Sequence, residues 1–289
     1  MRQDLTRCFI EAAHLLESAD SLIIAAGAGM GVDSGLPDFR GPGGFWQVYP
    51  ALGRAGLRFE EIASPAVFRS DPTLAWGFYG HRLNLYRATV PHAGFQLLKD
   101  WLEAMPLGGF VYTSNVDGQF QRAGFAEQQI VECHGSIHHL QCLAHCSEAI
   151  WSADDFFPEI DAEACRITSA MPRCPRCGAL ARPAILMFSD WEWADGRSET
   201  QSVRFNAWRR EVERPVLIEL GAGSTVATVR YFSQRQNCPI IRINPSEWEL
   251  PSGRGVGIPS GALAGLGGVQ TWMGHERCAK AHGISHSGG

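Results

Sequence analysis

The stretch from Ser21 to Trp46 constrains the fold of this chain more than any other part of the sequence. It reads SLIIAAGAGMGVDSGLPDFRGPGGFW and opens with the apolar run 22–26, which is typical of a buried parallel strand. Gly27 and Gly29 follow at once, where missing side chains let backbone N–H groups approach a phosphate. This order predicts a nucleotide-binding loop in an α/β protein. A tight strand-to-helix turn without a ligand is the alternative.

The dehydrogenase form of such a loop is not supported. The G-x-G-x-x-G fingerprint requires a glycine where this chain has Val32, and an acid roughly 20 residues further on for the ribose. Residues 44–49, which lie at that distance, contain no carboxylate. The sequence therefore predicts a nucleotide loop without predicting hydride transfer.

Composition places the chain among ordinary globular proteins. Its 289 residues are 45% hydrophobic and 19% charged, which suits one large domain or a core domain with a smaller inserted one. The formal net charge of −5 gives no electrostatic case for nucleic-acid or anionic-membrane binding. No apolar run reaches the roughly 20 residues of a membrane span, and the N-terminus lacks the apolar region of a signal peptide. We therefore expect a cytoplasmic protein with reduced cysteines.

Short apolar strands that end in polar loops recur along the chain. The predicted strands cover residues 22–26, 109–113, 130–133, 215–220 and 239–243, and predicted helices cover 4–17, much of 54–87, and 91–105. The repetition of strand, polar loop and helix predicts an α/β fold with a doubly wound parallel sheet. Ligands bind such sheets at the carboxyl ends of the strands, which is where the polar motifs lie.

Two close cysteine pairs interrupt this alternation. Cys142-x3-Cys146 and Cys174-x2-Cys177 are separated by 27 residues. Each short pair can chelate one metal ion, and four thiolates complete a tetrahedral zinc site that has no open position. We expect one structural zinc ion. Unrelated buried cysteines or a redox pair is the alternative.

An amide and a carboxylate stand in the turn Thr-Ser-Asn-Val-Asp at the end of the second predicted strand. Asn115 and Asp117 supply them, and His134 follows 19 residues after Asn115, at the end of the next strand. A histidine between a strand end and a glycine, in register with that turn, favours a general base. A structural histidine is the alternative. His138 and His139, just beyond, are interpreted as the entry to the metal module.

These ordered motifs resemble the sirtuin family of NAD-dependent protein deacylases. The resemblance extends from Leu22 to Asn244 and rests on Gly-Ala-Gly, Gly-Leu-Pro-Asp-Phe-Arg-Gly, Gly-Gly-Phe-Trp, the Asn-Val-Asp turn, His-Gly, the two cysteine pairs and a late glycine loop. It implies a Rossmann-like NAD-binding domain and a smaller domain made of a zinc module and a helical module. The implied boundaries are 1–47, 88–136 and 183–272 for the NAD-binding domain, 48–87 for the helical module, 137–182 for the zinc module, and 273–289 for a flexible tail.

The resemblance also implies which residues contact NAD, and they fall in four segments. They are Gly27, Ala28 and Gly29; Asp38, Phe39, Arg40 and Trp46; Ser114, Asn115, Val116 and Asp117; and Gly221, Ala222, Gly223 and Asn244. The first segment would face the diphosphate, assisted by Arg40, while Phe39 would cover the nicotinamide. Asn115 would hold the ribose and a water, and Asp117 the nicotinamide carboxamide. The last segment would line the adenosine side.

The implied reaction passes the acyl group of a modified lysine to ADP-ribose as nicotinamide leaves. His134 would be the base that deprotonates a ribose hydroxyl, with Asn115 and Asp117 beside it in the catalytic set. The implied cofactors are NAD and one structural zinc ion, and the implied partners are acyl-lysine proteins. A protein mono-ADP-ribosyltransferase and a non-catalytic NAD-binding interaction module are the alternatives. His134 argues against both, because neither needs this base.

Tyr79 and Arg82 match the Tyr-x-x-Arg arrangement of sirtuins that prefer succinyl- or malonyl-lysine. At i and i+3 of a predicted helix their side chains share one face, and an arginine with a phenol can clamp a distal carboxylate. A solvated arginine beside a packed tyrosine is the alternative. Phe188 and Ser189 lie where the family has its substrate-pairing segment, which reads Phe-Ser-Asp here in place of Phe-Gly-Glu.

Overall fold

The computed structural model describes residues 2–37 and 47–273, which pack into two compact units. The first unit consists of residues 1–33, 92–112 and 206–289, and the second of residues 34–91 and 113–205. None of the helices in the described stretches combines the length and hydropathy needed to cross a membrane.

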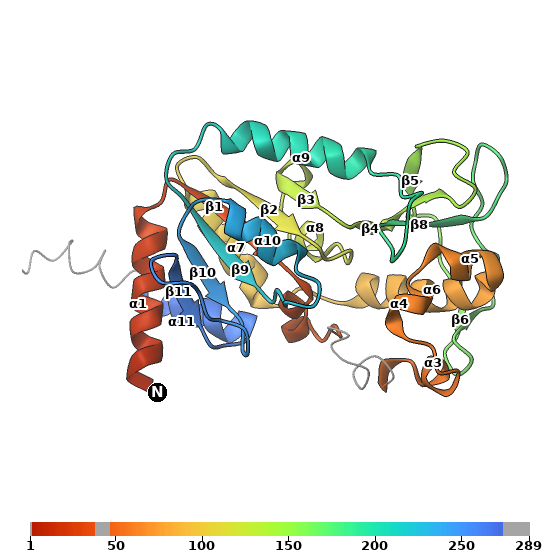
Figure 1. The fold of residues 1–289 in the computed structure, drawn as a ribbon, viewed down its shortest axis with the longest axis horizontal. Helices are drawn as coiled ribbons and strands as arrows, with labels where there is room; N and C mark the ends of the chain where they lie inside the picture. Colours follow the sequence, from red (N-terminus) through yellow and green to blue (C-terminus); the bar gives the residue numbers. More distant parts are fainter. Residues whose placement is uncertain (1, 38–46, 274–289) are drawn as a thin grey trace, which may run out of the picture. The chain divides into compact units, whose positions relative to one another are not determined.

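A parallel sheet forms the centre of the first unit (Figure 1). Its strands are β1 (Ser21–Ala26), β2 (Gly109–Thr113), β9 (Pro215–Leu220), β10 (Ile240–Ile243) and β11 (Gly255–Ile258). β1 pairs with β9, β9 with β10, and β10 with β11, each in parallel register. β1, β9 and β10 are buried along their whole length, which explains why they are almost entirely apolar. The charged exceptions are Glu219 of β9 and Arg242 of β10, which are bonded to each other at 2.6 Å.

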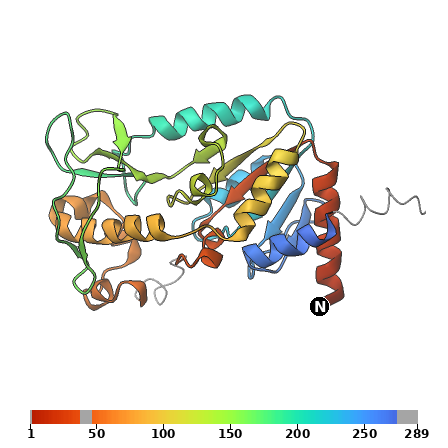
Figure 2. The ribbon, with the colours of Figure 1, turned by 180° about the vertical axis from the view of Figure 1, so that it is seen from behind.

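Helices cover both faces of this sheet, as Figures 1 and 2 show from opposite sides. α10 (Thr228–Arg235) lies on one face against β1 and β9, while α7 (Ala93–Ala104) and α11 (Ala262–Trp272) lie on the other. α1 (Arg2–Ser18) packs against α11 and β11, and α9 (Gly196–Arg209) contributes its last residues to this unit. The doubly wound arrangement predicted from the sequence is confirmed.

The strand order places two glycine loops next to each other. The order is β11-β10-β9-β1-β2-β3, with β3 (Ile130–Glu132) as an edge strand. From β1 the chain proceeds to β2 and β3, whereas from β9 it proceeds in the other direction to β10 and β11. The topological switch point therefore lies between β1 and β9, and ligands of open α/β sheets bind at the carboxyl ends of the strands at this point.

Only five strands were predicted, so the strands within residues 135–185 and the last strand, β11, were missed. β11 and β5 (Ile150–Ser152) show two reasons, which are glycines within a strand and short length. β11 contains Gly255 and Gly257, and the backbone requires both. Gly255 has φ +127, and a Cβ there would stand 2.1 Å from the Ile240 carbonyl oxygen. A Cβ on Gly257 would stand 2.2 Å from the Trp248 carbonyl oxygen. β5 is only three residues long and lies inside the cysteine module.

The second unit combines small sheets with helices. β5, β4 (Gly135–Cys142) and β8 (Ala181–Ile185) form an antiparallel sheet, and β6 (Ile160–Asp161) pairs with β7 (Arg166–Ile167). Its described helices are α3 (Pro50–Arg54), α4 (Phe59–Ile62), α5 (Pro65–Ser70), α6 (Pro72–Ala88) and α8 (Gln119–Arg122), together with most of α9. The described residues of the two units also contain three 3-10 turns, which are η1 (Ala28–Met30), η2 (Val32–Ser34) and η3 (Glu127–Gln129).

α6 carries the core of the second unit. Asp71 caps its first turn by accepting the Leu74 N–H at 3.1 Å, as expected for an aspartate at an N-cap. Trp76 is fully buried and donates its indole N–H to the Ala181 carbonyl of β8 at 3.0 Å. Phe68 of α5 stacks on Tyr79 with ring centroids 5.5 Å apart. α6 is therefore buried over much of its length, and its Arg82 is enclosed by the rings of Phe78, Tyr79 and Tyr86.

Candidate active site and zinc site

The loops that follow β1 and β9 lie against each other at the switch point. The Gly29 N–H donates to the Gly221 carbonyl at 3.1 Å, and a Cβ on Gly27 would stand 2.9 Å from that same oxygen. Gly221 itself has φ +58, and a Cβ there would stand 2.3 Å from the Gly29 carbonyl carbon. These glycines are required by the contact between the two loops. The resulting surface lacks side chains at the edge where such sheets bind nucleotides, so it fits a dinucleotide.

Some of the N–H groups expected to face a phosphate are engaged inside the protein. The Gly27 N–H donates to the Leu220 carbonyl at 2.9 Å, and the Gly29 N–H is held by Gly221 as described above. The predicted diphosphate contacts of this segment therefore cannot come from both of these N–H groups without breaking existing bonds. The segment is well fixed before any ligand binds.

His92 supports the first glycine loop, a contribution that the sequence reasoning missed. Its Nδ1 accepts the Gly94 N–H at 3.0 Å, so Nε2 carries the ring proton and donates to the Met30 carbonyl at 3.0 Å. Burial lowers the pKa of His92, which keeps this tautomer neutral. The Pro-His-Ala sequence at a helix start was the signal, because a histidine at an N-cap can accept a backbone N–H.

The second glycine loop is held by Asn244, which follows β10. The Asn244 side chain is 1% exposed, and its Nδ2 donates to the Ala222 carbonyl at 2.9 Å. Its Oδ1 accepts the N–H groups of Ser246 at 3.0 Å and Glu247 at 2.9 Å. Both ends of the amide are thus bonded within the first unit. Asn244 joins the loops after β9 and β10.

Four residues of the predicted NAD set have no structural description. Asp38, Phe39, Arg40 and Trp46 lie outside the described residues. Their predicted contacts with the diphosphate and the nicotinamide stay predictions from the sequence.

In the second unit, the turn after β2 and the end of β3 lie side by side. The Cys133 N–H donates to the Thr113 carbonyl at 2.9 Å, and the Ile137 N–H donates to the Val116 carbonyl at 3.0 Å. The His134 ring is hydrogen-bonded to the backbone of Ser114. The structure therefore brings together Ser114, Asn115, Asp117 and His134, which we call the strand-end cluster.

His134 has the properties of a neutral base. Burial lowers its pKa below the usual value, and the bond to the Ser114 backbone opposes this shift only in part. A backbone carbonyl that accepts from one ring nitrogen leaves the other nitrogen free of its proton. The imidazole can thus accept a proton near neutral pH.

Asp117 is a buried carboxylate whose protonation is finely balanced. It is 8% exposed, and its Oδ1 accepts the Gln119 N–H at 2.9 Å. Burial raises its pKa to about 6, with a further increase from the charge of Glu132, while the Gln119 bond and the charge of Arg82 act in the opposite direction. At neutral pH Asp117 is an acceptor in an apolar environment, which suits recognition of an amide N–H.

His138 supports the backbone around Asp117. Its Nε2 bonds to the Asp117 carbonyl oxygen at 2.9 Å. Gly118 has φ +70, and a Cβ there would stand 2.8 Å from the His138 ring. His138 and His139 both lie on β4, which leads to Cys142, so their predicted position at the entry to the metal module is correct. The support that His138 gives to Asp117 was not predicted.

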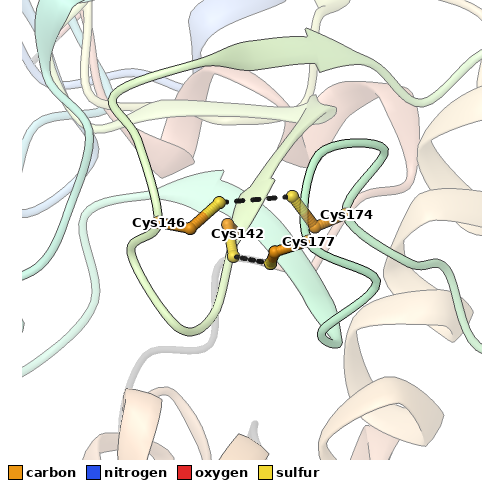
Figure 3. A group of neighbouring side chains, drawn as sticks. All are labelled: Cys142, Cys146, Cys174 and Cys177. Carbon is orange, nitrogen blue, oxygen red and sulfur yellow. Dashed lines mark hydrogen bonds between the residues drawn. The ribbon is translucent and has the colours of Figure 1, made fainter.

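The four cysteines form one cluster in the second unit (Figure 3). Their sulfur atoms all lie within 4.8 Å of one another, with Cys142 and Cys177 at 3.6 Å and Cys146 and Cys174 at 3.6 Å. A zinc ion with Zn–S bonds of about 2.3 Å in a tetrahedron requires sulfur atoms about 3.8 Å apart. The cluster therefore fits one zinc ion. Gly178 ends the second pair in a left-handed turn, with φ +74.

Tyr79 and Arg82 lie on α6 and are both buried, which excludes a solvated arginine. Tyr79 is 1% and Arg82 is 8% exposed. Arg82 donates from Nε and Nη2 to the Tyr86 phenol oxygen at 3.0 and 2.7 Å. Its guanidinium carbon also lies 5.2 Å from the centroid of the Phe78 ring. Tyr86 is a residue of this group that the sequence reasoning missed.

Phe188 and Ser189 lie in the loop after β8, which is hydrogen-bonded to the backbone of His134. The Leu186 N–H donates to the His134 carbonyl at 3.0 Å, and the Phe188 N–H donates to the Ala63 carbonyl at 2.9 Å. Phe188 is 38% exposed, and Ser189 has φ +54, a conformation that glycine adopts more easily. The partly exposed Phe188 side chain is therefore only two residues along the chain from Leu186, whose N–H is bonded to His134.

A buried ion pair holds the same loop. Arg182 of β8 and Asp190 form two hydrogen bonds of 2.7 and 2.9 Å, and both side chains are almost fully enclosed. Asp190 also accepts the N–H groups of Met187 at 3.3 Å and Glu192 at 3.2 Å. Asp190 stands where the family's Phe-Gly-Glu segment has its glutamate. Its carboxylate lies inside the loop and holds the loop's backbone in this conformation.

The sequence of this chain is similar to a family model and to known proteins. A protein-family model described as the Sir2 family matches residues 27–213. An NAD-dependent protein deacylase of Thermococcus sibiricus is 30% identical over 244 residues, which are 82% of this chain and 85% of that protein. NAD-dependent protein deacylase 2 of Pyrobaculum aerophilum is 31% identical over 239 residues, which are 80% of this chain and 82% of that protein.

Solved structures agree on the fold. A mutant Sir2 homologue in complex with ADP-ribose has a TM-score of 0.67 and 23% identity, and the match covers 95% of this chain and 98% of that one. A Sir2 homologue in complex with NAD has a TM-score of 0.65 and 23% identity, with 93% of each chain covered. The fold of this chain, a Rossmann-like sheet with a smaller domain, is therefore the fold of these proteins.

Proposed function

Because this chain belongs to the Sir2 family, we propose that it is an NAD-dependent protein lysine deacylase with a preference for negatively charged acyl groups. The observation that carries the deacylase assignment is the strand-end cluster, in which His134 and the turn of Asn115 and Asp117 are joined by backbone bonds. We assign the reaction to the cytoplasm and expect no direct contact with nucleic acid, given the net charge of −5.

His134 is the proposed general base. NAD, when bound, supplies the ADP-ribosyl group that accepts the acyl group and the nicotinamide that leaves. His134 accepts the proton of a ribose hydroxyl at its unprotonated ring nitrogen. The bond from its ring to the Ser114 backbone orients the imidazole, and burial keeps it neutral so that it can act near pH 7.

The remaining NAD contacts are proposed in two groups. In the second unit, Asp117 accepts the carboxamide N–H of nicotinamide, and Asn115 binds a ribose hydroxyl. In the first unit, the glycine loops after β1 and β9 accommodate the phosphates and the adenosine. We propose that Asn244 acts through the shape of these loops, because its amide is bonded to Ala222, Ser246 and Glu247.

The four cysteines hold the proposed zinc ion, which has a structural function. Four thiolate ligands leave no position for a substrate or a water molecule. The helical module of residues 48–87 and the zinc module of residues 137–182 are the proposed parts of the small domain. The remaining described residues are assigned to the NAD-binding domain.

The acyl preference rests on Arg82. A guanidinium enclosed by aromatic rings is poorly hydrated, so an anionic acyl group that reaches it replaces little water and gains a strong charged hydrogen bond. Tyr86 already accepts from Nε and Nη2, which fixes the orientation of the guanidinium plane. Tyr79 is adjacent on the same helix face. We propose that Arg82 binds the distal carboxylate of succinyl- or malonyl-lysine.

A panel of peptides tests this proposal. Peptides that differ only in the acyl group of one lysine are incubated with NAD, and nicotinamide, deacylated peptide and acyl-ADP-ribose are measured by mass spectrometry. Succinyl-lysine is expected to exceed acetyl-lysine in kcat/KM. Because a hydrogen bond to a charged group is worth about 1.5–3 kcal/mol, Arg82→Met is expected to lower the succinyl-to-acetyl ratio by about 10–150-fold.

Controls separate the activity from the specificity. Arg87, five residues along the same helix, is bonded to the carbonyls of Phe156 and Ala153, so Arg87→Met removes an arginine of α6 outside the proposed clamp. It is expected to leave the ratio unchanged. A wild-type protein that prefers acetyl-lysine contradicts the clamp alone. ADP-ribose that stays attached to the peptide, with no deacylated product, contradicts the deacylase assignment.

A further inference from the structure

A cavity lined entirely by polar residues lies in the second unit, between α9 and the η3 turn. Its volume is about 310 Å³, and the residues that line it are Glu127, Gln128, Arg197, Thr200, Gln201 and Arg204. Cavities of about 300 Å³ lie at the lower end of the range that holds small ligands. None of the six residues belongs to the proposed NAD or acyl-lysine contacts. The cavity is therefore a second candidate site, independent of the proposed function.

One face of α9 forms a wall of this cavity. The four lining residues of α9 have the spacing i, i+3, i+4 and i+7, which places their side chains on the same side of the helix. Hydrogen bonds join α9 to β3, because Gln201 Oε1 accepts the Glu132 N–H at 3.0 Å and the Ser198 hydroxyl donates to the Glu132 carbonyl at 2.7 Å. The helix is thus fixed against the segment 127–132 without any ligand.

Gln201 contributes a buried donor to the cavity. The residue is 2% exposed, and its Oε1 is engaged by Glu132. Its Nε2 has no hydrogen-bond partner among the residues that the structure describes. A buried donor that makes no bond is costly, so an oxygen that enters the cavity and accepts from Nε2 gains a favourable bond. The cavity therefore favours a ligand with an acceptor group beside Gln201.

Arg197 belongs to a group with a net negative charge, because two carboxylates share its guanidinium. Its Nη2 donates to Glu127 Oε1 at 2.9 Å, and its Nη1 donates to Glu132 Oε2 at 2.5 Å. The Glu132 side chain is 1% exposed, whereas the Glu127 side chain is 61% exposed. Glu127 is therefore the carboxylate that a ligand can reach, and it forms the negative side of the cavity.

Arg204 supplies the positive side of the cavity. Its Nε donates to the Gln128 carbonyl at 3.3 Å. Across residues 2–37 and 47–273, no carboxylate forms an ion pair with its guanidinium. An arginine can bind a carboxylate through two N–H groups. Arg204 is three positions after Gln201 on the same helix face, so one ligand carboxylate can accept from both side chains.

We propose that this cavity binds a small zwitterion with a polar side chain, of the class of free amino acids. The ligand carboxylate accepts hydrogen bonds from Arg204 and from Gln201 Nε2, and the ligand ammonium group donates to Glu127. A phosphate ion complements only the positive side and is repelled by the Glu127 carboxylate. Because every residue that lines the cavity is polar, the side chain of the ligand is polar as well.

Binding measurements without NAD or an acyl peptide test this proposal. The wild type is titrated with L-glutamine, L-asparagine, L-serine, L-glutamate and inorganic phosphate, and binding is followed by saturation-transfer NMR and by calorimetry. At least one of the amino acids is expected to bind saturably and more tightly than phosphate. The amide of that amino acid lacks the carboxylate, and its N-acetyl derivative lacks the ammonium group. Each is expected to bind at least about tenfold more weakly, because a charged hydrogen bond is lost.

Variants of α9 locate the ligand in the cavity. Arg204→Met is expected to weaken binding of the amino acid at least about tenfold. Arg204→Lys keeps the charge and loses the paired N–H groups, so a weakening of about threefold or more is expected. It tests the proposal if Arg204→Met is poorly folded in thermal unfolding. Arg210→Met removes an exposed arginine directly after α9 and is the matched control, with an expected change below about twofold.

Three outcomes contradict the proposal. The first is the absence of saturable binding for all four amino acids. The second is phosphate that binds more tightly than any of them, which indicates a simple anion site. The third is an equal effect of Arg204→Met and Arg210→Met, which indicates general electrostatics. Because NAD takes no part in these measurements, each of these outcomes leaves the deacylase assignment to its own tests.

Discussion

The four cysteines and the strand-end cluster belong to the same unit, yet different forces hold their polar groups together. The sulfur atoms converge from two loops, and sulfur pairs 3.6 Å apart gain their main stabilisation from a metal ion. His134 and Asp117 are joined instead by backbone hydrogen bonds between neighbouring segments and by burial. The first cluster depends on an added ion for its fold. The second is already formed and uses burial to adjust its chemistry.

Removing the zinc ligands should have the largest effect. Cys174→Ser, or a strong chelator, is expected to unfold the cysteine module and abolish activity, because metal binding and folding are coupled in such sites. Metal analysis should find about one zinc per chain in the wild type and far less in the variant, with a lower melting temperature. Cys238→Ser, in the first unit, is the control and should retain the zinc. Full activity in a zinc-free protein would contradict the structural assignment.

His134→Ala should leave the fold intact and stop the chemistry. Loss of a general base lowers a rate by about 10²–10⁴-fold, while the neighbouring backbone bonds do not depend on the imidazole. Turnover is measured with an acyl-lysine peptide, and NAD binding is measured separately by calorimetry. Near wild-type turnover would mean that the base lies elsewhere. Lost zinc or lost NAD binding would mean that the two clusters are not independent.

Acid pH should act on the strand-end cluster through Asp117. Burial raises the pKa of Asp117 to about 6, so the carboxylate gains its proton as the pH falls through 6. Protonated Asp117 no longer accepts an amide N–H. We expect kcat/KM to fall about tenfold per pH unit below pH 6, with circular dichroism showing an intact fold. An unchanged kcat/KM between pH 7 and pH 5 would contradict this role of Asp117.

His138→Phe should have the smallest effect. The variant loses the bond to the Asp117 carbonyl, worth about 1 kcal/mol, and keeps a ring of similar size beneath Gly118. We expect KM for NAD to rise about threefold to tenfold with little change in kcat. The zinc content should be unchanged. An equal loss in kcat would show that His138 affects the base as well as the turn.

Sequence reasoning succeeded where the signal is local. The predicted strands are mostly apolar, the cysteines of the expected zinc site lie in two short pairs, and Asn115, Asp117 and His134 each follow a strand that the pattern predicts. Knowing that parallel strands end at one edge was enough to expect that these groups converge. The contact between Cys133 and Thr113 confirms that expectation.

It did not identify the residues whose roles depend on packing between distant segments. Tyr86 matters because it accepts from Arg82, and Arg182 because Asp190 turns inward to meet it. An aromatic residue on a helix and an arginine in a strand have no distinctive pattern in the sequence. The same holds for Gln201, which lies on a helix that the apolar periodicity did not predict.

The contact between Gly27 and Gly221 has a consequence for how this protein can vary over evolution. Each glycine leaves the space that the other loop's backbone occupies, so a side chain at either position requires the opposite loop to retreat. Substitutions at the two positions therefore depend on each other, although the positions are 194 residues apart in the chain. We expect a side chain at either position to be tolerated only together with a compensating change in the opposite loop, and a single substitution at either position to be selected against.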